Sequence, residues 1–211
     1  QIDTQRNNNP WLLRAAQSLA EAFRLAASKE LDVEFTELVT GYRLRENYKG
    51  TFVDIYLYDS LSSGAGYAVS VADEIELLLD KVEELLKNCD CENACHNCLK
   101  HYRNHHVHGL LDRFAALELL DWGRKGILAQ AISNEKQVVY VGTLTHILDM
   151  SGCKINIMSD SITVCRHGKQ KQIVVYPAMW VEPYIKDTIF ISDSLIKYAK
   201  PYAIQKIIEG C

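Results

Sequence analysis

Residues 89–98 read CDCENACHNC, which places four cysteines within ten residues in the spacing C-x-C-x3-C-x2-C. Disulfides within so short a segment would strain their geometry, and a reducing compartment would not preserve them. Four thiolates on one turning segment are instead a ligand set for tetrahedral Zn²⁺, with Zn–S distances of about 2.3 Å. The spacing therefore predicts one zinc site with these ligands: Cys89, Cys91, Cys95 and Cys98.

Other interpretations of the four cysteines stay open at this stage. An iron–sulfur cluster also takes four thiolates, although it usually draws them from more widely separated positions. The cysteines could also be buried without a metal, or His96 or His101 could replace one thiolate. If all four bind zinc, no coordination position stays open, so we expect the metal to stabilise the fold rather than to activate water.

Basic residues flank the cysteines. Lys87, Lys100 and Arg103 could offset the negative charge of a four-thiolate site. Lys100 and Arg103, together with the histidine-rich loop 101–108, could also form a nucleic-acid-binding edge. Histidines in such a loop are more often surface or core residues than metal ligands.

The composition is that of an ordinary globular protein, with 211 residues of which 48% are hydrophobic and 24% are charged. The net charge of -4 means that any nucleic-acid surface must be local. No apolar run is long enough for a membrane span and no secretory signal is present, so we expect a cytoplasmic protein without membrane contact. The start at Gln1 and the polar residues that follow suggest a fragment of a longer protein, with 1–9 as a disordered linker.

The first part of the chain has the patterns of a mixed helix and sheet domain. Apolar residues recur every three or four positions in stretches that predict these helices: Pro10 to Ser28, Tyr67 to Asn88 and Leu111 to Arg124. Paired strands are predicted from Leu31 to Arg43 and from Thr51 to Tyr58, with a polar turn between them at Glu46 to Gly50. We expect short antiparallel strands and helices packed around the cysteines in a domain of residues 10–130.

The pattern changes after a polar break at Ser133 to Lys136. Short strands are predicted there at Val138 to Val141, Ile155 to Met158, Ile162 to Arg166, Ile173 to Tyr176 and Thr188 to Ile191. His167 to Gln170 predicts a hairpin turn, and a last helix is expected from about Ser192 to Ile208. The fold class is therefore mixed α/β (α+β), with a small α/β domain at 134–211.

The loop Ser62 to Gly66 lies between a predicted strand and a predicted helix. Free backbone N–H groups at such a position can bind a phosphate. Alternatively, Ser62 or Ser63 caps the helix and the glycines allow close packing. The chain has no G-x-x-x-x-G-K-[ST] sequence, so it is not a self-contained NTPase of the P-loop type.

A combination of motifs resembles the MZB-type zinc-binding domain, a family found at or near the C-terminus of DEAD/DEAH-box helicases and of related DNA repair and anti-phage defence proteins. The similarity covers about residues 10–127 and is carried by Leu57-Tyr58-Asp59-Ser60, Gly64-Ala65-Gly66-Tyr67, the four cysteines with Leu99, His108, Leu111-Asp112-Arg113 and Ala116. The resemblance implies zinc bound by the four cysteines. Ser63-Gly64 replaces the family's usual double glycine, and residues 134–211 match nothing in the family.

Asp112 and Arg113 have two interpretations. A carboxylate and a guanidinium at a helix start can hold the cysteine segment to that helix by charge-assisted hydrogen bonds. Alternatively, Arg113 contacts DNA. Neighbouring apolar residues indicate a partly buried helix start, which favours the structural role.

Three functions follow from these features. The first is a C-terminal zinc-binding accessory region of an ATP-dependent DNA helicase or translocase, whose partners are the rest of the helicase chain or a helicase subunit and DNA. The second is a protein-interaction module that docks a partner subunit. The third places a nuclease in the tail, where Asp160, Glu182, Lys186 and Asp187 are residue types used in metal-assisted phosphodiester cleavage. No catalytic motif was found, so we assign no catalytic residue.

Overall fold

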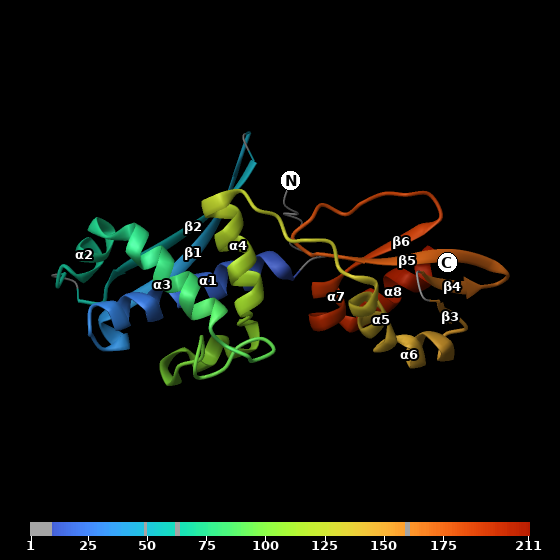
Figure 1. Ribbon diagram of the computed structural model, residues 1–211, viewed down its shortest axis with the longest axis horizontal. Coiled ribbons are helices and arrows are strands. Elements are labelled where there is room, and N and C mark those ends of the chain that lie inside the picture. The colour runs from blue at the N-terminus through green and yellow to red at the C-terminus, as the bar shows by residue number, and fades with distance from the viewer. Residues whose placement is uncertain (1–9, 49, 62–63, 159–160) are drawn as a thin grey trace. The chain divides into compact units, whose positions relative to one another are not determined.

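The computed structural model describes residues 10–48, 50–61, 64–158 and 161–211. Two compact units are present, one formed by Leu13–Ile127 and the other containing Leu128–Cys211. Both combine helices with a small sheet, which confirms the predicted fold class (Figure 1). The predicted linker 1–9 lies outside the described residues, and the domain limits 10–130 and 134–211 stay a proposal. Within the described ranges, no helix is both long and apolar enough to cross a membrane.

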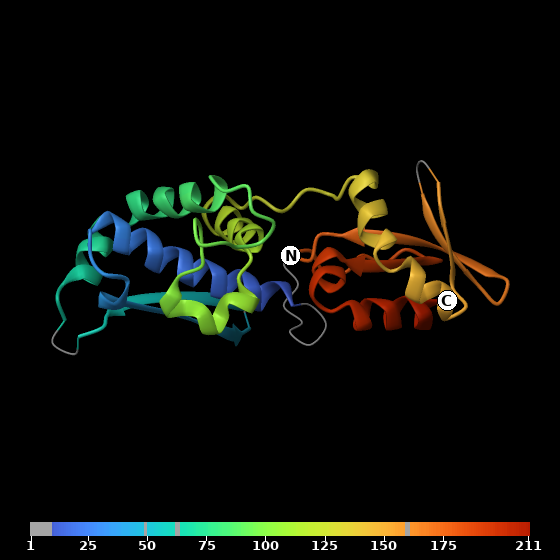
Figure 2. The same cartoon turned by 90° about the horizontal axis from the view of Figure 1, so that it is seen from below.

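The first unit contains six α- or 3-10 helical segments around one hairpin in its described part. In chain order the elements are α1 (Trp11–Glu30), η1 (Phe35–Glu37), β1 (Leu38–Asn47), β2 (Gly50–Asp59), α2 (Tyr67–Asp73), α3 (Ile75–Lys87), η2 (Tyr102–Leu110) and α4 (Arg113–Lys125). Figure 2 shows α1 lying between α3 on one side and the β1–β2 hairpin on the other. The central position of α1 explains why it is buried on more than one face.

Helix α1 packs closely because much of its surface is alanine. Ala15, Ala16, Ala20 and Ala22 are completely buried, and small side chains let neighbouring elements approach the helix backbone. This confirms the helix predicted from Pro10. Three polar residues of α1, Ser18, Glu21 and Ser28, are also buried and need hydrogen-bond partners inside the unit.

The hairpin begins later than the sequence pattern predicts. Strand β1 starts at Leu38, so the predicted start at Leu31 is wrong, and Phe35 instead lies in η1. Phe35 is only 5% exposed, and Arg24 of α1 donates from Nε to its carbonyl oxygen at 3.1 Å. Burial of the ring and this bond to α1 hold the segment in a turn, which overrides its alternating pattern. Strand β2 confirms the predicted strand Thr51 to Tyr58.

The predicted helix Tyr67 to Asn88 is interrupted. Glu74 has φ -119° and ψ 38°, and this non-helical residue separates α2 from α3. Helix α3 buries a stripe made of Leu78, Val82 and Leu86. The predicted helix from Leu111 is confirmed as α4, which ends at Gly126 in the left-handed conformation with φ 67°.

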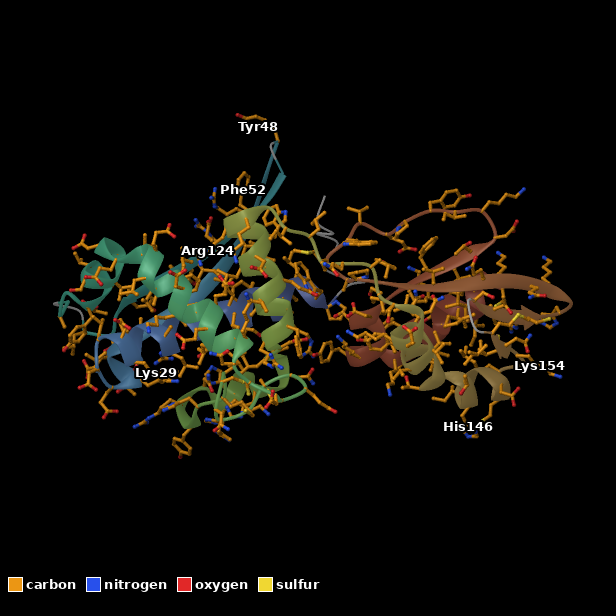
Figure 3. The ribbon with its side chains drawn as sticks, in the orientation of Figure 1. Lys29, Tyr48, Phe52, Arg124, His146 and Lys154 are labelled. Atoms are coloured by element: carbon orange, nitrogen blue, oxygen red, sulfur yellow. The ribbon has the colours of Figure 1, made fainter. Side chains whose placement is uncertain are left out.

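An ion-pair cluster joins α3 to α4. Arg124 contacts Asp80 at 2.9 Å and Glu76 at 3.1 Å, and Figure 3 shows Arg124 among the side chains between the two helices (Figure 3). Lys125 contacts Glu83 at 2.9 Å. Hydrogen bonds from Lys87 and Lys125 lower the pKa of Glu83 to about 2. Lys87 is therefore paired within this cluster, whereas the sequence suggested a role beside the cysteines.

The second unit contains four helices and a four-stranded sheet in its described part. The elements are α5 (Asn134–Gly142), α6 (Thr145–Met150), β3 (Lys154–Ile157), β4 (Ile162–Arg166), β5 (Lys169–Tyr176), β6 (Thr188–Ser192), α7 (Asp193–Tyr198) and α8 (Lys200–Gly210). The strand order is β3-β4-β5-β6, with β6 parallel to β5 and the other pairs antiparallel. Alternate residues of β4, β5 and β6 join the helices in one apolar core.

Two details of this unit differ from the sequence prediction. The strand predicted at Val138 to Val141 is wrong, because these residues lie in α5. Gln137 of α5 donates to Ile132 O at 2.9 Å and accepts from Val175 N at 2.8 Å, while Val141 is fully buried in the core. These tertiary contacts outweigh the preference of β-branched residues for strands. The last helix is also divided, at Ala199.

The hairpin turn between β4 and β5 is confirmed. Arg166 pairs with Lys169, and the two residues between them, His167 and Gly168, have φ values of 50° and 79°. Positive φ at both central positions matches the right-handed twist of two antiparallel strands.

Candidate metal centre

The four cysteines lie in the segment that leaves α3. The backbone turns directly after the helix, where Cys89 N–H donates to Lys87 O at 2.9 Å. A second turn forms at Cys95, whose carbonyl oxygen accepts from the N–H groups of Cys98, Leu99 and Lys100 at 3.2, 3.1 and 2.9 Å. Two turns in so short a segment bring the two ends of the cysteine run together.

The sulfur positions fit a tetrahedral zinc ion. The four Sγ atoms lie within 4.8 Å of one another, with Cys89–Cys95 at 3.5 Å, Cys91–Cys98 at 3.6 Å and Cys95–Cys98 at 3.9 Å. Four sulfurs held about 2.3 Å from one tetrahedral centre would lie about 3.8 Å apart. The separations are far too long for a disulfide, and all seven cysteines are free. The thiols therefore have the arrangement of a metal site.

Backbone N–H groups support the sulfurs. Cys95 N–H donates to Cys98 Sγ at 3.2 Å, and Asn97 N–H donates to Cys95 Sγ at 3.4 Å. The bond from Asn97 lowers the pKa of Cys95 to about 7, whereas loss of solvent raises the pKa of Cys91 and Cys98. A bound cation would compensate the negative charge of the four thiolates, including the buried Cys98.

A family model, that of the MrfA Zn-binding domain (MZB), matches residues 12–99. Residues 12–99 of the chain belong to the MZB family. With four thiolates arranged for one ion, the MZB site is a structural Zn²⁺ site, as predicted from the cysteine spacing. The family match ends just after Cys98, so it includes every ligand.

Two relatives add to the comparison. Druantia protein DruE from Escherichia coli is 31% identical over 185 residues, which cover 84% of this chain and 10% of DruE. A stretch of that length must include part of the unit Leu128–Cys211. The uncharacterized protein MJ1572.1 from Methanocaldococcus jannaschii is 30% identical over 86 residues, which cover 39% of this chain and 77% of that protein.

Among solved structures, the crystal structure of the DUF1998 helicase MrfA bound to DNA is similar to this chain. The similarity covers 56% of this chain and 15% of the MrfA chain, with 17% sequence identity and a TM-score of 0.43. That score is too low for the arrangement of elements to be compared in detail.

Arg113 connects the cysteine segment of the MZB domain to α3 and α4 by hydrogen bonds. Its Nε donates to Cys91 O at 3.0 Å, its Nη1 donates to Leu86 O at 3.0 Å, and its backbone N–H donates to Asn93 O at 2.8 Å. The residue is only 7% exposed, and its guanidinium lies 3.9 Å from the ring centroid of Phe114. These contacts describe the structural role. The burial argues against a DNA contact, which stays untested.

Asp112 caps α4 beside Arg113. Its Oδ1 accepts from Phe114 N at 2.9 Å and Ala115 N at 3.2 Å, which satisfies two N–H groups of the first turn. The backbone N–H of Asp112 donates to Ser18 Oγ of α1 at 2.7 Å. This bond satisfies the buried hydroxyl of Ser18 and connects the start of α4 to α1.

A buried polar network beneath the histidine-rich loop was missed by the sequence interpretation. Asn104 is fully buried, and its Nδ2 donates to Glu21 Oε2 and to Leu99 O, both at 2.9 Å. Its Oδ1 accepts from His101 N at 2.7 Å and His108 Nε2 at 2.9 Å. Only the buried Glu21 in an otherwise apolar stripe of α1 could have signalled such a network from the sequence.

The histidines do not join the metal site in the part of the chain that the structure describes. The group able to hold a metal consists of the four cysteines alone. His101 stacks on Phe35 with ring centroids 4.1 Å apart. His108 Nε2 lies between two oxygens, Asn104 Oδ1 and His101 O, so this nitrogen carries the proton. His96 is exposed. These positions give no support to a histidine in place of a thiolate.

Lys100 and Arg103 lie on the outside of the same segment. Lys100 is half-buried and Arg103 is exposed, and no acidic partner is found for either side chain among the described residues. A role for them in binding nucleic acid stays a prediction.

The strand-to-helix loop already contains an anion of the protein itself. Asp59, at the end of β2, accepts from Gly66 N at 2.7 Å and from Ala68 N at 2.8 Å. These bonds lower the pKa of Asp59, so the carboxylate is held in its charged form at the start of α2. It takes the position that a phosphate would need. Ser62 and Ser63, proposed as caps, lie outside the described residues.

The acidic residues of the proposed tail nuclease do not form a metal site where the structure describes them. Glu182 pairs with Lys206, while Lys186 and Asp187 are exposed. Asp160 lies outside the described residues. No group of three His, Cys, Asp or Glu ligands is found among the described residues of this unit.

Proposed function

We propose that this chain is the zinc-binding accessory region of an ATP-dependent DNA helicase or translocase that acts in DNA repair or anti-phage defence. The similarity to Druantia protein DruE carries the proposal, because it runs through the MZB domain into the second unit. The chain spans only 10% of DruE, which is consistent with a role as one region of a much larger protein. The family is named after MrfA, and MrfA is described as a DUF1998 helicase bound to DNA.

In this role the zinc site contributes rigidity rather than chemistry. A closed set of four thiolates has no open position for water or substrate. The metal would hold the segment 89–98 in one conformation. Arg113, at the start of α4, would fix this segment relative to α3 and α4 through its hydrogen bonds to Cys91 and Leu86. A stiff platform of this kind can position nucleic acid beside a motor.

The test uses the longer protein that contains this chain. We expect the purified protein to hydrolyse ATP in a DNA-dependent manner, and the isolated 211-residue chain to hydrolyse none because it has no P-loop. Cys95→Ser in the longer protein should lower the zinc content. It should also reduce the amount of unwinding or translocation on DNA per ATP hydrolysed. Cys165→Ser, outside the zinc site, serves as the matched control.

Two results would contradict the proposal. One is a longer protein without DNA-dependent ATP hydrolysis. The other is a Cys95→Ser protein that has lost its zinc but unwinds or translocates on DNA as efficiently as the unaltered protein.

A protein-interaction module is the alternative, and one observation favours it. Val181, Tyr184 and Ile185, in the connection between β5 and β6, are 47%, 91% and 60% exposed. Apolar side chains grouped in one loop are typical of a docking surface. If Tyr184→Ala abolished assembly with another subunit and left DNA-dependent ATP hydrolysis unchanged, the second unit would have this role.

A further inference from the structure

The outer face of the β1–β2 hairpin presents aromatic rings and arginines to solvent. We call this the aromatic face, and its residues are Arg43, Arg45, Phe52, Asp54, Tyr56 and Tyr58. Arg45 pairs with Phe52 and Arg43 with Asp54 in the antiparallel register, so these side chains share one face of the hairpin. Figure 3 shows the tip of the hairpin, marked by Tyr48, projecting past the helices of its unit.

The two faces of β2 differ. One face carries the apolar residues expected of a core, and the other carries large aromatic rings that are unusually exposed. Val53, Ile55 and Leu57 alternate with the aromatic residues and are less exposed than they are. Phe52, Tyr56 and Tyr58 are 38%, 48% and 50% exposed. Three of the four outward positions from 52 to 58 therefore carry a ring that is partly open to solvent.

The rings lie in an ordered arrangement. Tyr56 lies over Gly41 of β1, where a Cβ atom would come within 2.7 Å of Tyr56 Cε2. Glycine at this position lets the ring lie against the backbone and turn its other side to solvent. The rings of Tyr56 and Tyr58 are 6.3 Å apart at an angle of 28°, so the two planes are nearly parallel.

The arginines are held beside the rings. Asp54 accepts from Arg43 Nη2 at 3.2 Å and from Arg45 Nη2 at 2.9 Å, and it also pairs with Arg45 Nε. The guanidinium of Arg45 lies 5.4 Å from the ring centroid of Phe52. With two guanidinium groups and one carboxylate, the aromatic face carries a net positive charge on a chain whose net charge is -4.

We propose that the aromatic face binds single-stranded nucleic acid, with bases stacked on Phe52, Tyr56 and Tyr58 and the backbone phosphates near Arg43 and Arg45. This inference rests on the proposed function and specifies which surface meets the nucleic acid. Exposed rings beside cationic side chains are the combination that non-sequence-specific single-strand binding uses. The net positive charge of the face is complementary to phosphate.

The ring spacing favours a single strand over a duplex. Nucleotides in one strand of B-DNA rise by about 3.4 Å, and their bases are covered by their neighbours. Rings 6.3 Å apart can each receive one base only if the strand is extended and its bases are separated. A duplex would leave the aromatic face without stacking partners.

The experiment measures binding of the zinc-loaded 211-residue chain to a fluorescent oligothymidylate of about 20 nucleotides by anisotropy. Phe52→Ala and Tyr56→Ala should each weaken binding by about 5- to 100-fold, since one base–aromatic stack is lost. Tyr56→Phe keeps the ring and should bind like the unaltered chain. Tyr184→Ala removes an exposed tyrosine of the other unit and is the matched control. Zinc content and thermal unfolding check that each variant is folded.

The outcomes separate this inference from the proposed function. Binding that Phe52→Ala, Tyr56→Ala and Tyr58→Ala leave unchanged would overturn the inference, and loss only in Lys100→Ala or Arg103→Ala would place the nucleic acid at the histidine-rich loop. No binding by the unaltered chain, or equal affinity for a duplex of the same length, would also overturn it. The proposed function would then still be judged by DNA-dependent ATP hydrolysis of the longer protein.

Discussion

Arg113 Nε donates to the carbonyl oxygen of Cys91 at 3.0 Å, so a residue at the start of α4 holds the backbone of a zinc ligand. The same guanidinium donates to Leu86 O in the last turn of α3. One buried side chain thus connects the metal site to the two helices that flank it. This relationship makes the position of the zinc ligands depend on packing far from them in the sequence.

Replacing Arg113 should destabilise the MZB domain. Arg113→Ala leaves the buried carbonyl groups of Leu86 and Cys91 without these donors, and we expect a loss of about 2–4 kcal/mol in the free energy of unfolding. Urea denaturation followed by circular dichroism measures the change. Arg103→Ala, on the exposed side of the same segment, should change the stability by less than about 0.5 kcal/mol. Equal stability of the two variants would refute the structural role.

Removing the metal should unfold or loosen the first unit. We expect one Zn²⁺ per chain by elemental analysis, and chelation or Cys95→Ser should cost at least ~3 kcal/mol of stability because the thiolates lose their counter-ion. Cys165→Ser should keep the metal, since Cys165 lies in β4. Iron in place of zinc, or an unfolding temperature that chelation does not change, would contradict the assignment.

The buried amide of Asn104 should be hard to replace. Asn104→Ala removes four hydrogen bonds and leaves the buried carboxylate of Glu21 without this donor, so we expect a loss of about 2–5 kcal/mol. In a double-mutant cycle, Glu21→Gln with Asn104→Ala should cost less than the sum of the two single changes. Asn156→Ala, on the exposed side of β3, is the control. Additive effects would show that the two side chains do not interact.

The ion-pair cluster between α3 and α4 should make stability depend on acid pH. The pKa of Glu83 is lowered from 4.5 to about 2 by Lys87 and Lys125, so its charged form stabilises the folded state. That contribution is complete above pH 4.5 and is lost as the pH falls toward 2. Glu83→Gln should therefore lower the unfolding temperature at neutral pH and flatten its decrease in acid.

Zinc release in acid adds its own pH dependence, so the measured quantity is the difference between the variant and the unaltered chain. Glu84→Gln is the matched control, because Glu84 is 61% exposed and lies 3.7 Å from Lys81. An exposed pair of that kind contributes less than about 1 kcal/mol. If Glu83→Gln and Glu84→Gln had the same pH profile, the cluster would have no special role.

Much of the local structure could be predicted because its signals are local. The spacing of four cysteines defines a metal site whatever surrounds it, since ligand type and reach are properties of a few consecutive residues. The periodic apolar stripes of α1, α3 and α4 likewise identify helices. Errors occurred where tertiary contacts outweighed a local preference, as in residues 138–141, which are rich in β-branched side chains that favour a strand but lie in α5.

The sequence by itself determined the zinc ligands, the mixed fold class and the family resemblance, because each depends on residue type and short spacing. Only the tertiary structure decided that Arg113 is buried against Cys91, that Asn104 joins Glu21 across 83 residues, and that Asp59 occupies the loop suggested for phosphate. It also placed the rings of β2 on a face that is partly open to solvent. These outcomes depend on which segments pack together, and long-range packing leaves no fixed spacing in the sequence.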